Sequence, residues 1–354
     1  MNSKERVLTT FANQQPDRVP INYMSNPGID GRLKEHFGLE SDDKEGLRQA
    51  LGVDFRPVSP TYVGPELHED IPERGVTVDN WGRHRRWIEH QSGGYWDFCD
   101  FPLSDADEEE VSNWPMPNPD DYDYSDVYNS CERCEQFAIH QYGGGDIIDG
   151  NGMIRGMEQT FVDLATDNPA GLLLADRRME IQVEMSRRTL EAARGRIDII
   201  WLAEDLGTQI APLISMELFR KQIRPRYQKF CELAKAYDVF VMMHSCGSSS
   251  WAYEEFIEMG IHVVDTLQPE PKDMAPEYLK KKFGGRLAFH GCISTAGPVA
   301  TGTVEETVAY CRRTLDIMMP GGGYCLSPTH ALQDNSPTEN VVAMYETAQT
   351  YGRY

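Results

Sequence analysis

The sequence has no uninterrupted apolar run of the roughly 20 residues that a membrane-spanning helix needs. It is also poor in cations, because 34 Lys and Arg face 56 Asp and Glu, which gives a formal net charge of −22. Such a charge repels nucleic-acid phosphates and anionic lipid surfaces, so we expect neither nucleic acid nor a membrane as a partner. Residues 1–15 are polar and lack the apolar centre of a signal peptide, which predicts a cytoplasmic protein.

Two further signatures are missing. The eight cysteines are scattered over 354 residues, a distribution that favours reduced thiols, metal ligands or core packing over a disulfide framework. Cys131 and Cys134 have the spacing of a redox or zinc pair, but no second pair accompanies them, and chance explains them better. The glycines at 143–145 do not form a dinucleotide-binding fingerprint, which needs further spaced glycines and a helix directly after them.

Short β-branched runs alternate with helical stretches through the C-terminal two-thirds of the chain, a pattern typical of βα units. The clearest strands are predicted at 197–202, 239–243, 262–266, 286–289 and 323–326, and three earlier ones at 18–22, 53–56 and 146–149. Helices are predicted at 216–236, 252–259, 277–283 and 304–319. Eight strands with helices between them predict an (α/β)₈ or TIM barrel.

Residues from about 57 to 140 break this alternation, because they are rich in Pro, Gly, Trp and acidic side chains. The alternating stretch Val76–Trp87 predicts an antiparallel β-hairpin, and residues 115–121 a loop. We therefore predict one barrel domain over residues 1–354 with an insertion at about 57–140; the alternative is a second independent domain.

Ligand-type side chains gather where the predicted strands end. In barrels of this kind the loops after the strands converge on one face, which carries the active site. The side chains at these positions are those of Asn22, Tyr23, Asn151, Glu204, Asp205, His244, Cys246, Gln268, His290, Cys292, Cys325 and His330. Their number exceeds what packing requires.

The sharpest motif is His244-Ser-Cys246, directly after a predicted strand. Residues two apart on an extended segment point to the same side, so the imidazole and the thiol can bind one metal ion. Cys325 ends the last predicted strand, which barrel closure brings towards the same face. Two thiolates and an imidazole suit Zn²⁺ with an open fourth position. The alternative is a histidine bonded to the backbone and two ordinary buried thiols.

Several motifs also resemble a known family. Lys4–Leu8, Asp17–Pro20, Gly321–Tyr324, Pro337–Asn340 and Tyr351–Gly352 make the whole chain similar to the uroporphyrinogen decarboxylase superfamily, whose fold is a distorted (α/β)₈ barrel. Within it, the His-x-Cys motif with a distant Cys resembles the zinc motif of the corrinoid-dependent methyltransferases.

That resemblance implies His244, Cys246 and Cys325 as zinc ligands. It further implies a methyl group moved between a corrinoid (methylcobamide), carried by a partner protein, and a small thiol or methoxy- or methylamine-type substrate. A homodimer is implied as well. The decarboxylase branch fits less well, because its arginine pair after the first strand has no counterpart here; Arg32 is the one nearby arginine.

Roles for the other strand-end residues follow as expectations. Glu204, Asp205 and His330 are the predicted catalytic groups, and we expect the cofactor to contact Asn22, Asn151 and Gln268. One alternative activity is a lyase on a carboxylated substrate, with the same catalytic residues as proton donors. Another is a binding protein without chemistry.

The second His-x-Cys motif, His290-Gly-Cys292, is expected to form a tight turn with Cys292 packed beneath it, and not a metal site.

Overall fold

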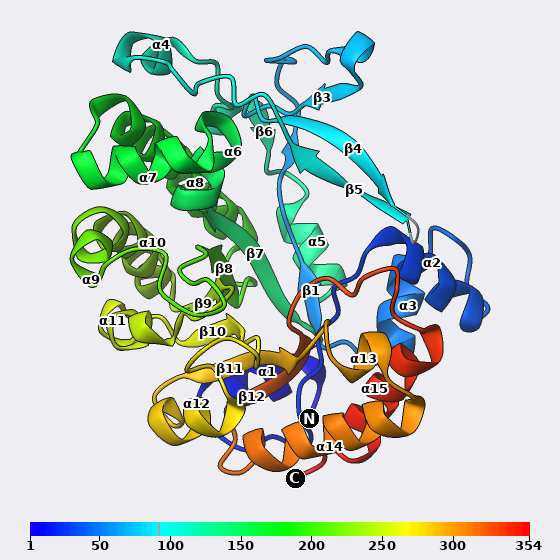
Figure 1. Cartoon of the computed structure of the whole chain (residues 1–354). Coiled ribbons are helices and arrows are strands. Elements are labelled where there is room, and N and C mark those ends of the chain that lie inside the picture. The colour runs from blue at the N-terminus through cyan, green and yellow to red at the C-terminus, as the bar shows by residue number, and fades with distance from the viewer. Residues whose placement is uncertain (91–92) are drawn as a thin grey trace.

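The computed structural model describes residues 1–90 and 93–354. Its centre is a parallel sheet of seven strands that curls into a barrel wall with helices outside (Figure 1). The order is β1-β7-β8-β9-β10-β11-β12, and every neighbouring pair is parallel. The bounds are β1 Phe55–Pro57, β7 Ala138–Gly145, β8 Ile199–Ala203, β9 Phe240–Ser245, β10 Val263–Thr266, β11 Ala288–Ile293 and β12 Tyr324–Pro328. The predicted fold class, a distorted α/β barrel, is confirmed.

Helices cover the outside of this sheet and the amino end of the barrel. Those predicted at 216–236, 252–259, 277–283 and 304–319 are confirmed within a residue or two, the first being interrupted by a π-helical turn, η3 (Phe219–Ile223). The bounds are α1 Ser3–Phe11, α2 Pro27–His36, α3 Lys44–Ala50, α6 Ile147–Arg155, α7 Met157–Thr166, α8 Pro169–Ala193, α9 Met216–Leu218, α10 Arg224–Tyr237, α11 Tyr253–Met259, α12 Pro276–Phe283, α13 Pro298–Thr301, α14 Val304–Met318 and α15 Thr338–Thr350. None of the helices in the described ranges is long and apolar enough to cross a membrane.

The eighth position of the wall, between β12 and β1, is filled by residues 18–22 without a full strand. Ile21 forms one isolated parallel bridge with Leu326, and its carbonyl accepts a hydrogen bond from the amide of Asp54. The prediction of a strand at 18–22 is therefore only partly correct. Pro20 lacks an N–H group, which interrupts the ladder that a strand here would need.

The strand predicted at 146–149 is wrong, because these residues begin helix α6 and the strand, β7, precedes them. The amides of Ile147 and Ile148 each donate a 2.8 Å hydrogen bond to the Glu204 carboxylate, which caps the helix from another strand end. The sequence signal for β7 was hidden by its three glycines. A side chain at Gly143 would meet Ile200 at 2.6 Å, so close packing explains that glycine.

The segment between β1 and β7 forms two small antiparallel sheets. β2 (Thr61–Tyr62) pairs with β6 (Tyr122–Asp123), and β3 (Val76–Val78), β4 (His84–His90) and β5 (Gly93–Phe98) form a three-stranded sheet. The hairpin predicted within Val76–Trp87 is confirmed. Figure 1 shows β4 and β5 as an arm that projects beside the barrel towards α2. The remaining elements of the segment are η1 Pro72–Arg74, α4 Glu108–Asn113, η2 Pro119–Asp121 and α5 Val127–Arg133.

The core has one layer between sheet and helices and one inside the barrel. All five residues of β8 are buried, as expected of a strand covered on both faces. Inside the barrel, Phe11 of α1 packs on Phe55 and Phe240, with ring centroids 6.1 and 5.8 Å apart. Helix α1 thereby closes the amino end of the barrel, and the opposite end is left for a binding site.

Candidate metal centre

One row of side chains crosses the barrel wall at the carboxyl ends of its strands. His244 on β9, Asp265 on β10, His290 on β11 and Cys325 on β12 are successive register partners. Register partners in a parallel sheet point to the same face. The row therefore presents two imidazoles with a carboxylate between them.

Asp265 connects the two histidines. Its side chain is fully buried, with Oδ2 2.8 Å from Nδ1 of His244 and Oδ1 2.6 Å from Nδ1 of His290. Burial alone would raise the pKa of Asp265, but the two histidines lower it to about 2. An ionised carboxylate only accepts hydrogen bonds, so each histidine donates its Nδ1 proton to it. Nε2 of His244, which faces Sγ of Cys246, is therefore the ring nitrogen that can bind a metal once it has lost its proton.

The second histidine is fixed from both sides. Nδ2 of Asn22 lies 3.0 Å from Nε2 of His290, and Oδ1 of Asn22 accepts a hydrogen bond from the amide of Tyr23. Asn22 is therefore oriented as a donor to Nε2 of His290, and this contact holds the His290 ring in place. The predicted role of Asn22 in cofactor binding stays a prediction; its observed contacts position His290.

Asp205, His244 and Cys246 place one ligand atom each within 4.8 Å of the others. Sγ of Cys246 lies 3.4 Å from Nε2 of His244, and Oδ1 of Asp205 lies 3.8 Å from the same nitrogen. The loop is held by its backbone, since the amides of Cys246 and Gly247 donate to Asp205 and Gln268 at 2.7 and 2.9 Å. A thiol, an imidazole and a carboxylate fit Zn²⁺, and a carboxylate bonded to the far nitrogen of the imidazole is the usual support of such a ligand.

The structure does not bring Cys325 to this group. Cys325 is the second residue of β12 and follows His244 by three strands around the wall. Its thiol is fully buried in the interior cluster that includes Trp201 and Phe55, and among the described residues its hydrogen-bond contact is the Leu326 carbonyl at 3.9 Å. Burial raises the pKa of the Cys325 thiol well above its usual value, as expected of a thiol packed among apolar side chains.

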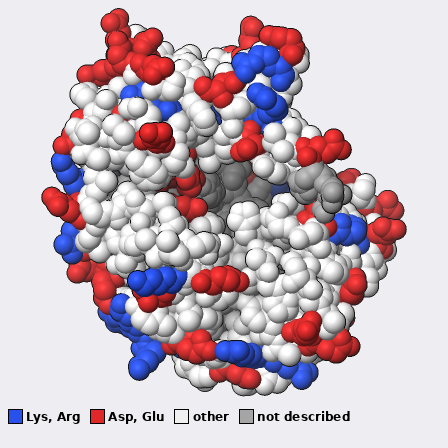
Figure 2. Space-filling model, in the orientation of Figure 1, with Lys and Arg blue, Asp and Glu red and all other residues white. Residues whose placement is uncertain are grey.

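A cavity of about 400 Å³ opens over His244 and Asp205. Figure 2 shows a hollow in the middle of one face of the molecule, with acidic side chains beside it. Among the carboxylates that line the cavity, burial and the neighbouring Asp205 raise the pKa of Asp149 to about 7. The full lining consists of Met24, His140, Tyr142, Asp146, Asp149, Trp201, Ala203, Asp205 and His244.

The other two predicted catalytic residues, Glu204 and His330, do not line this cavity. Glu204 is fully buried beneath it and receives hydrogen bonds from the α6 amides and from the Tyr227 hydroxyl at 2.7 Å. Burial raises the pKa of Glu204 to about 8, because desolvation outweighs these hydrogen bonds. His330 is exposed on the loop after β12, with Nε2 of Gln333 3.4 Å from its Nδ1. Asp205 is the one predicted catalytic residue that lines the cavity.

The predicted cofactor-contacting residues Asn151 and Gln268 act on neighbouring groups. Oδ1 of Asn151, which is buried, accepts a hydrogen bond from Arg178 at 2.9 Å, and Gln268 holds the Gly247 amide. The turn expected at His290–Cys292 is part of strand β11, with Cys292 buried and at φ 68°. Within the described ranges, neither His290 nor Cys292 belongs to a group of side chains that could hold a metal ion.

Sequence reasoning overlooked Asp146, Asp149 and Asp265. Asp265 lies next to the end of a strand that the sequence predicted correctly, so its position was a usable signal. The other two were assigned to a strand, although they belong to the first turn of α6 or precede it. The error in secondary structure concealed their place in the cavity.

The family match covers more than half of the chain, since the uroporphyrinogen decarboxylase family matches residues 153–351. The chain belongs to this family. The matched part of this family member includes Asp205, His244, Cys246, Asp265 and Cys325, and the resemblance inferred from the sequence is confirmed.

Comparison with solved structures supports the same fold. A methyltransferase from Methanosarcina mazei is similar to this family member over 99% of both chains, with a TM-score of 0.64 and 15% sequence identity. At that identity the likeness shows the fold alone. No curated protein matches the chain significantly.

Proposed function

We propose that this protein is a zinc-dependent methyltransferase. It would move a methyl group between a corrinoid, carried by a partner protein, and a small thiol or methoxy- or methylamine-type substrate. The observation that carries the proposal is the grouping of Asp205, His244 and Cys246 at the carboxyl ends of the strands, where Asp205 and His244 line a cavity. The similar fold of a protein described as a methyltransferase adds support.

In this arrangement some residues would bind the metal and another would orient a metal ligand. Asp205, His244 and Cys246 would hold the metal, while Asp265 keeps the His244 ring in the tautomer that leaves Nε2 free. Zinc bound there would favour the thiolate form of a substrate thiol or polarise an ether oxygen.

Proton transfer has a candidate among the other cavity residues. Asp149 lines the same cavity as His244 and Asp205, and burial raises its pKa. A carboxylate whose pKa is raised by burial can take a proton from a thiol bound in that cavity. Asp149 is therefore our candidate acceptor for the thiol proton.

The alternative, a lyase on a carboxylated substrate, has less support. Two of its three proton donors, Glu204 and His330, do not line the cavity. The burial of Glu204 under α6 and the exposure of His330 instead favour structural and surface roles for them.

The test is a spectroscopic assay with methylcobalamin and a small thiol such as 2-mercaptoethanesulfonate. We expect the zinc-loaded protein to produce cob(I)alamin, and Cys246→Ser to lower the rate at least 100-fold. Cys99→Ser, a change in the β5 region far along the chain from the site, is the matched control and should keep the rate. The proposal is overturned if thiols do not take the methyl group from methylcobalamin and if methyl ethers and methylamines do not methylate cob(I)alamin. Zinc-independent release of carbon dioxide from a carboxylated compound would support the lyase.

A further inference from the structure

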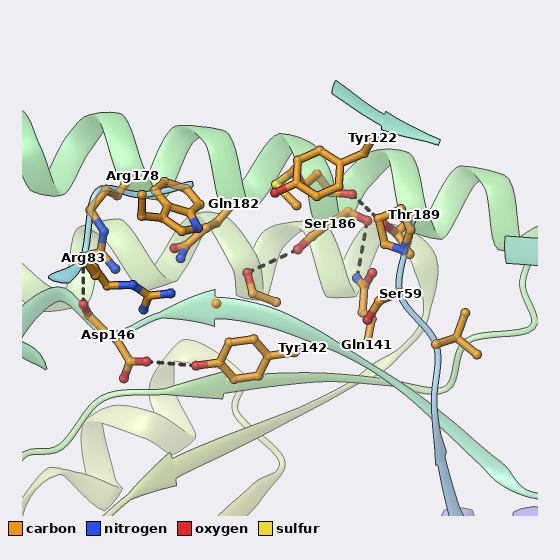
Figure 3. Close-up of a pocket in the computed structure, with 16 residues that line it drawn as sticks. Ser59, Arg83, Tyr122, Gln141, Tyr142, Asp146, Arg178, Gln182, Ser186 and Thr189 are labelled. Carbon is orange, nitrogen blue, oxygen red and sulfur yellow. Dashed lines mark hydrogen bonds between the residues drawn. The ribbon is translucent and has the colours of Figure 1, made fainter. Parts of the chain in front are cut away.

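A second cavity, of about 310 Å³, lies beside the cavity over His244 and Asp205, which we call the metal cavity. It is bounded by β7, by α8 and by the segment between β1 and β7, as Figure 3 shows. Tyr142 and Asp146 line both cavities, and the Tyr142 hydroxyl donates a 2.9 Å hydrogen bond to Oδ2 of Asp146. The two spaces are therefore neighbours separated by this pair.

Arg178 of α8 lines the second cavity as a buried cation. Only 4% of it is exposed, and it has no ion pair with a carboxylate within the described ranges. Its hydrogen bonds start from Nη1 and end at the Asp146 carbonyl and at Oδ1 of Asn151, 3.0 and 2.9 Å away. Nε is buried without a hydrogen-bond partner. A guanidinium in this state is costly to bury, and an anion beside it would offset that cost.

A second guanidinium lies at the same end of the cavity. Nε of Arg83 is 2.7 Å from Oδ2 of Asp79, which holds the side chain in place. Figure 3 shows Arg83 and Arg178 together at one end, with Tyr142 across from them. Asp146 is the one carboxylate among the lining residues, and its Oδ2 is engaged by Tyr142. Asp79 forms an ion pair with Arg83, so the cation of this cavity without an ion pair among the described residues is Arg178, and Arg83 contributes its remaining N–H donors.

Aromatic side chains also line this cavity. Trp81, Tyr122 and Tyr142 line the cavity, and the guanidinium carbon of Arg178 lies 5.9 Å from the centre of the Trp81 ring. Flat apolar walls favour a flat ligand, while the planar fork of a guanidinium matches a carboxylate. We propose that this cavity is a second ligand site, which binds the carboxylate of a small flat, aromatic molecule through Arg178 and Arg83.

The site needs neither the metal nor methyl transfer, so it is tested separately by calorimetric titration of the purified protein. The probes are benzoate and its neutral counterpart benzamide. We expect benzoate to bind saturably at one site per chain, and benzamide to bind at least tenfold more weakly. Cys246→Ser should leave benzoate binding unchanged, which distinguishes this cavity from the metal centre.

Arginine variants provide the decisive comparison. Arg83→Met and Arg178→Met should each weaken benzoate binding at least tenfold, and Arg187→Met, on the exposed side of α8, should not change it. Arg178 is buried, so circular dichroism must show that its variant folds; Arg83→Met carries the test if it does not. Equal binding of benzoate and benzamide, no binding of benzoate, or full affinity in the folded Arg83→Met protein overturns the proposal.

Discussion

Nδ1 of His244 lies 2.8 Å from Oδ2 of Asp265, its register partner on the next strand, and the other oxygen of that carboxylate binds His290. This relationship decides which nitrogen of His244 can bind a metal. The register of two neighbouring strands places the pair, so the barrel wall itself fixes the orientation of the His244 ring.

The first prediction concerns that support. Asp265→Asn replaces an acceptor for two N–H groups by an amide whose nitrogen must face one of them, which disturbs the tautomer of His244 or His290. We expect zinc affinity to fall about 10- to 100-fold, the usual effect of losing such a partner. Competition with a chromophoric chelator measures it. Asp198→Asn, which removes a buried carboxylate paired with Lys4 instead, is the control, and equal affinity in the two variants would contradict the prediction.

The second prediction concerns zinc content, which shows whether Asp205 or Cys325 is the third ligand beside His244 and Cys246. The geometry predicts that Asp205→Asn and Cys246→Ser lose most of the zinc, because each removes an atom of the group around Nε2 of His244. Cys325→Ser should retain about one zinc per chain, since its thiol lies in the interior cluster. Elemental analysis after gel filtration gives the answer. Loss of zinc in Cys325→Ser with retention in Asp205→Asn would restore Cys325 as the ligand.

The third prediction is a pH dependence of stability caused by His140. This side chain lines the metal cavity, and burial, together with the nearby His290, lowers its pKa to about 3. A histidine whose pKa is lowered by folding stabilises the fold above the unfolded pKa of about 6.5, and this contribution is lost as the pH falls towards 3. At pH 5.5 the loss is at most about 1.4 kcal/mol, since one pKa unit corresponds to about 1.36 kcal/mol.

Denaturation by urea at pH 7.5 and pH 5.5 checks this. His140→Gln cannot be protonated, so its stability should fall less over this range than that of the wild type. His36→Gln, at an exposed position on α2, should behave as the wild type does. The idea fails if the His140→Gln and wild-type proteins lose the same stability.

The fourth prediction assigns Glu204 to the fold. Glu204→Ala leaves the buried amides of Ile147 and Ile148 without their acceptor, while the Tyr227 hydroxyl keeps the Ala203 carbonyl. Each unsatisfied buried group costs about 1–3 kcal/mol, so we expect a loss of roughly 3 kcal/mol in the free energy of unfolding. Urea denaturation measures it, with Glu180→Ala, at an exposed site on α8, as a control within about 0.5 kcal/mol of wild type. A loss of activity without a loss of stability would instead place Glu204 in catalysis.

The sequence by itself determined the barrel and the face that carries the site. Continuous β-branched runs such as Ile197–Leu202 are local signals, and a residue that directly follows such a run must lie at the carboxyl end of its strand. His244 and Cys246 could be assigned to one metal for the same reason, because their relation depends on the geometry of a single extended segment.

Tertiary structure alone decided which residues lie beside His244 and Cys246. Asp205 reaches them across neighbouring strands, Asp265 through strand register, and Cys325 is turned into the interior cluster by its place in the closed wall. The start of α6 was decided in the same way, since its first amides are capped by Glu204, more than 50 residues away in the chain. Register, barrel closure and long-range capping depend on residues that are distant in sequence, and no local pattern records them.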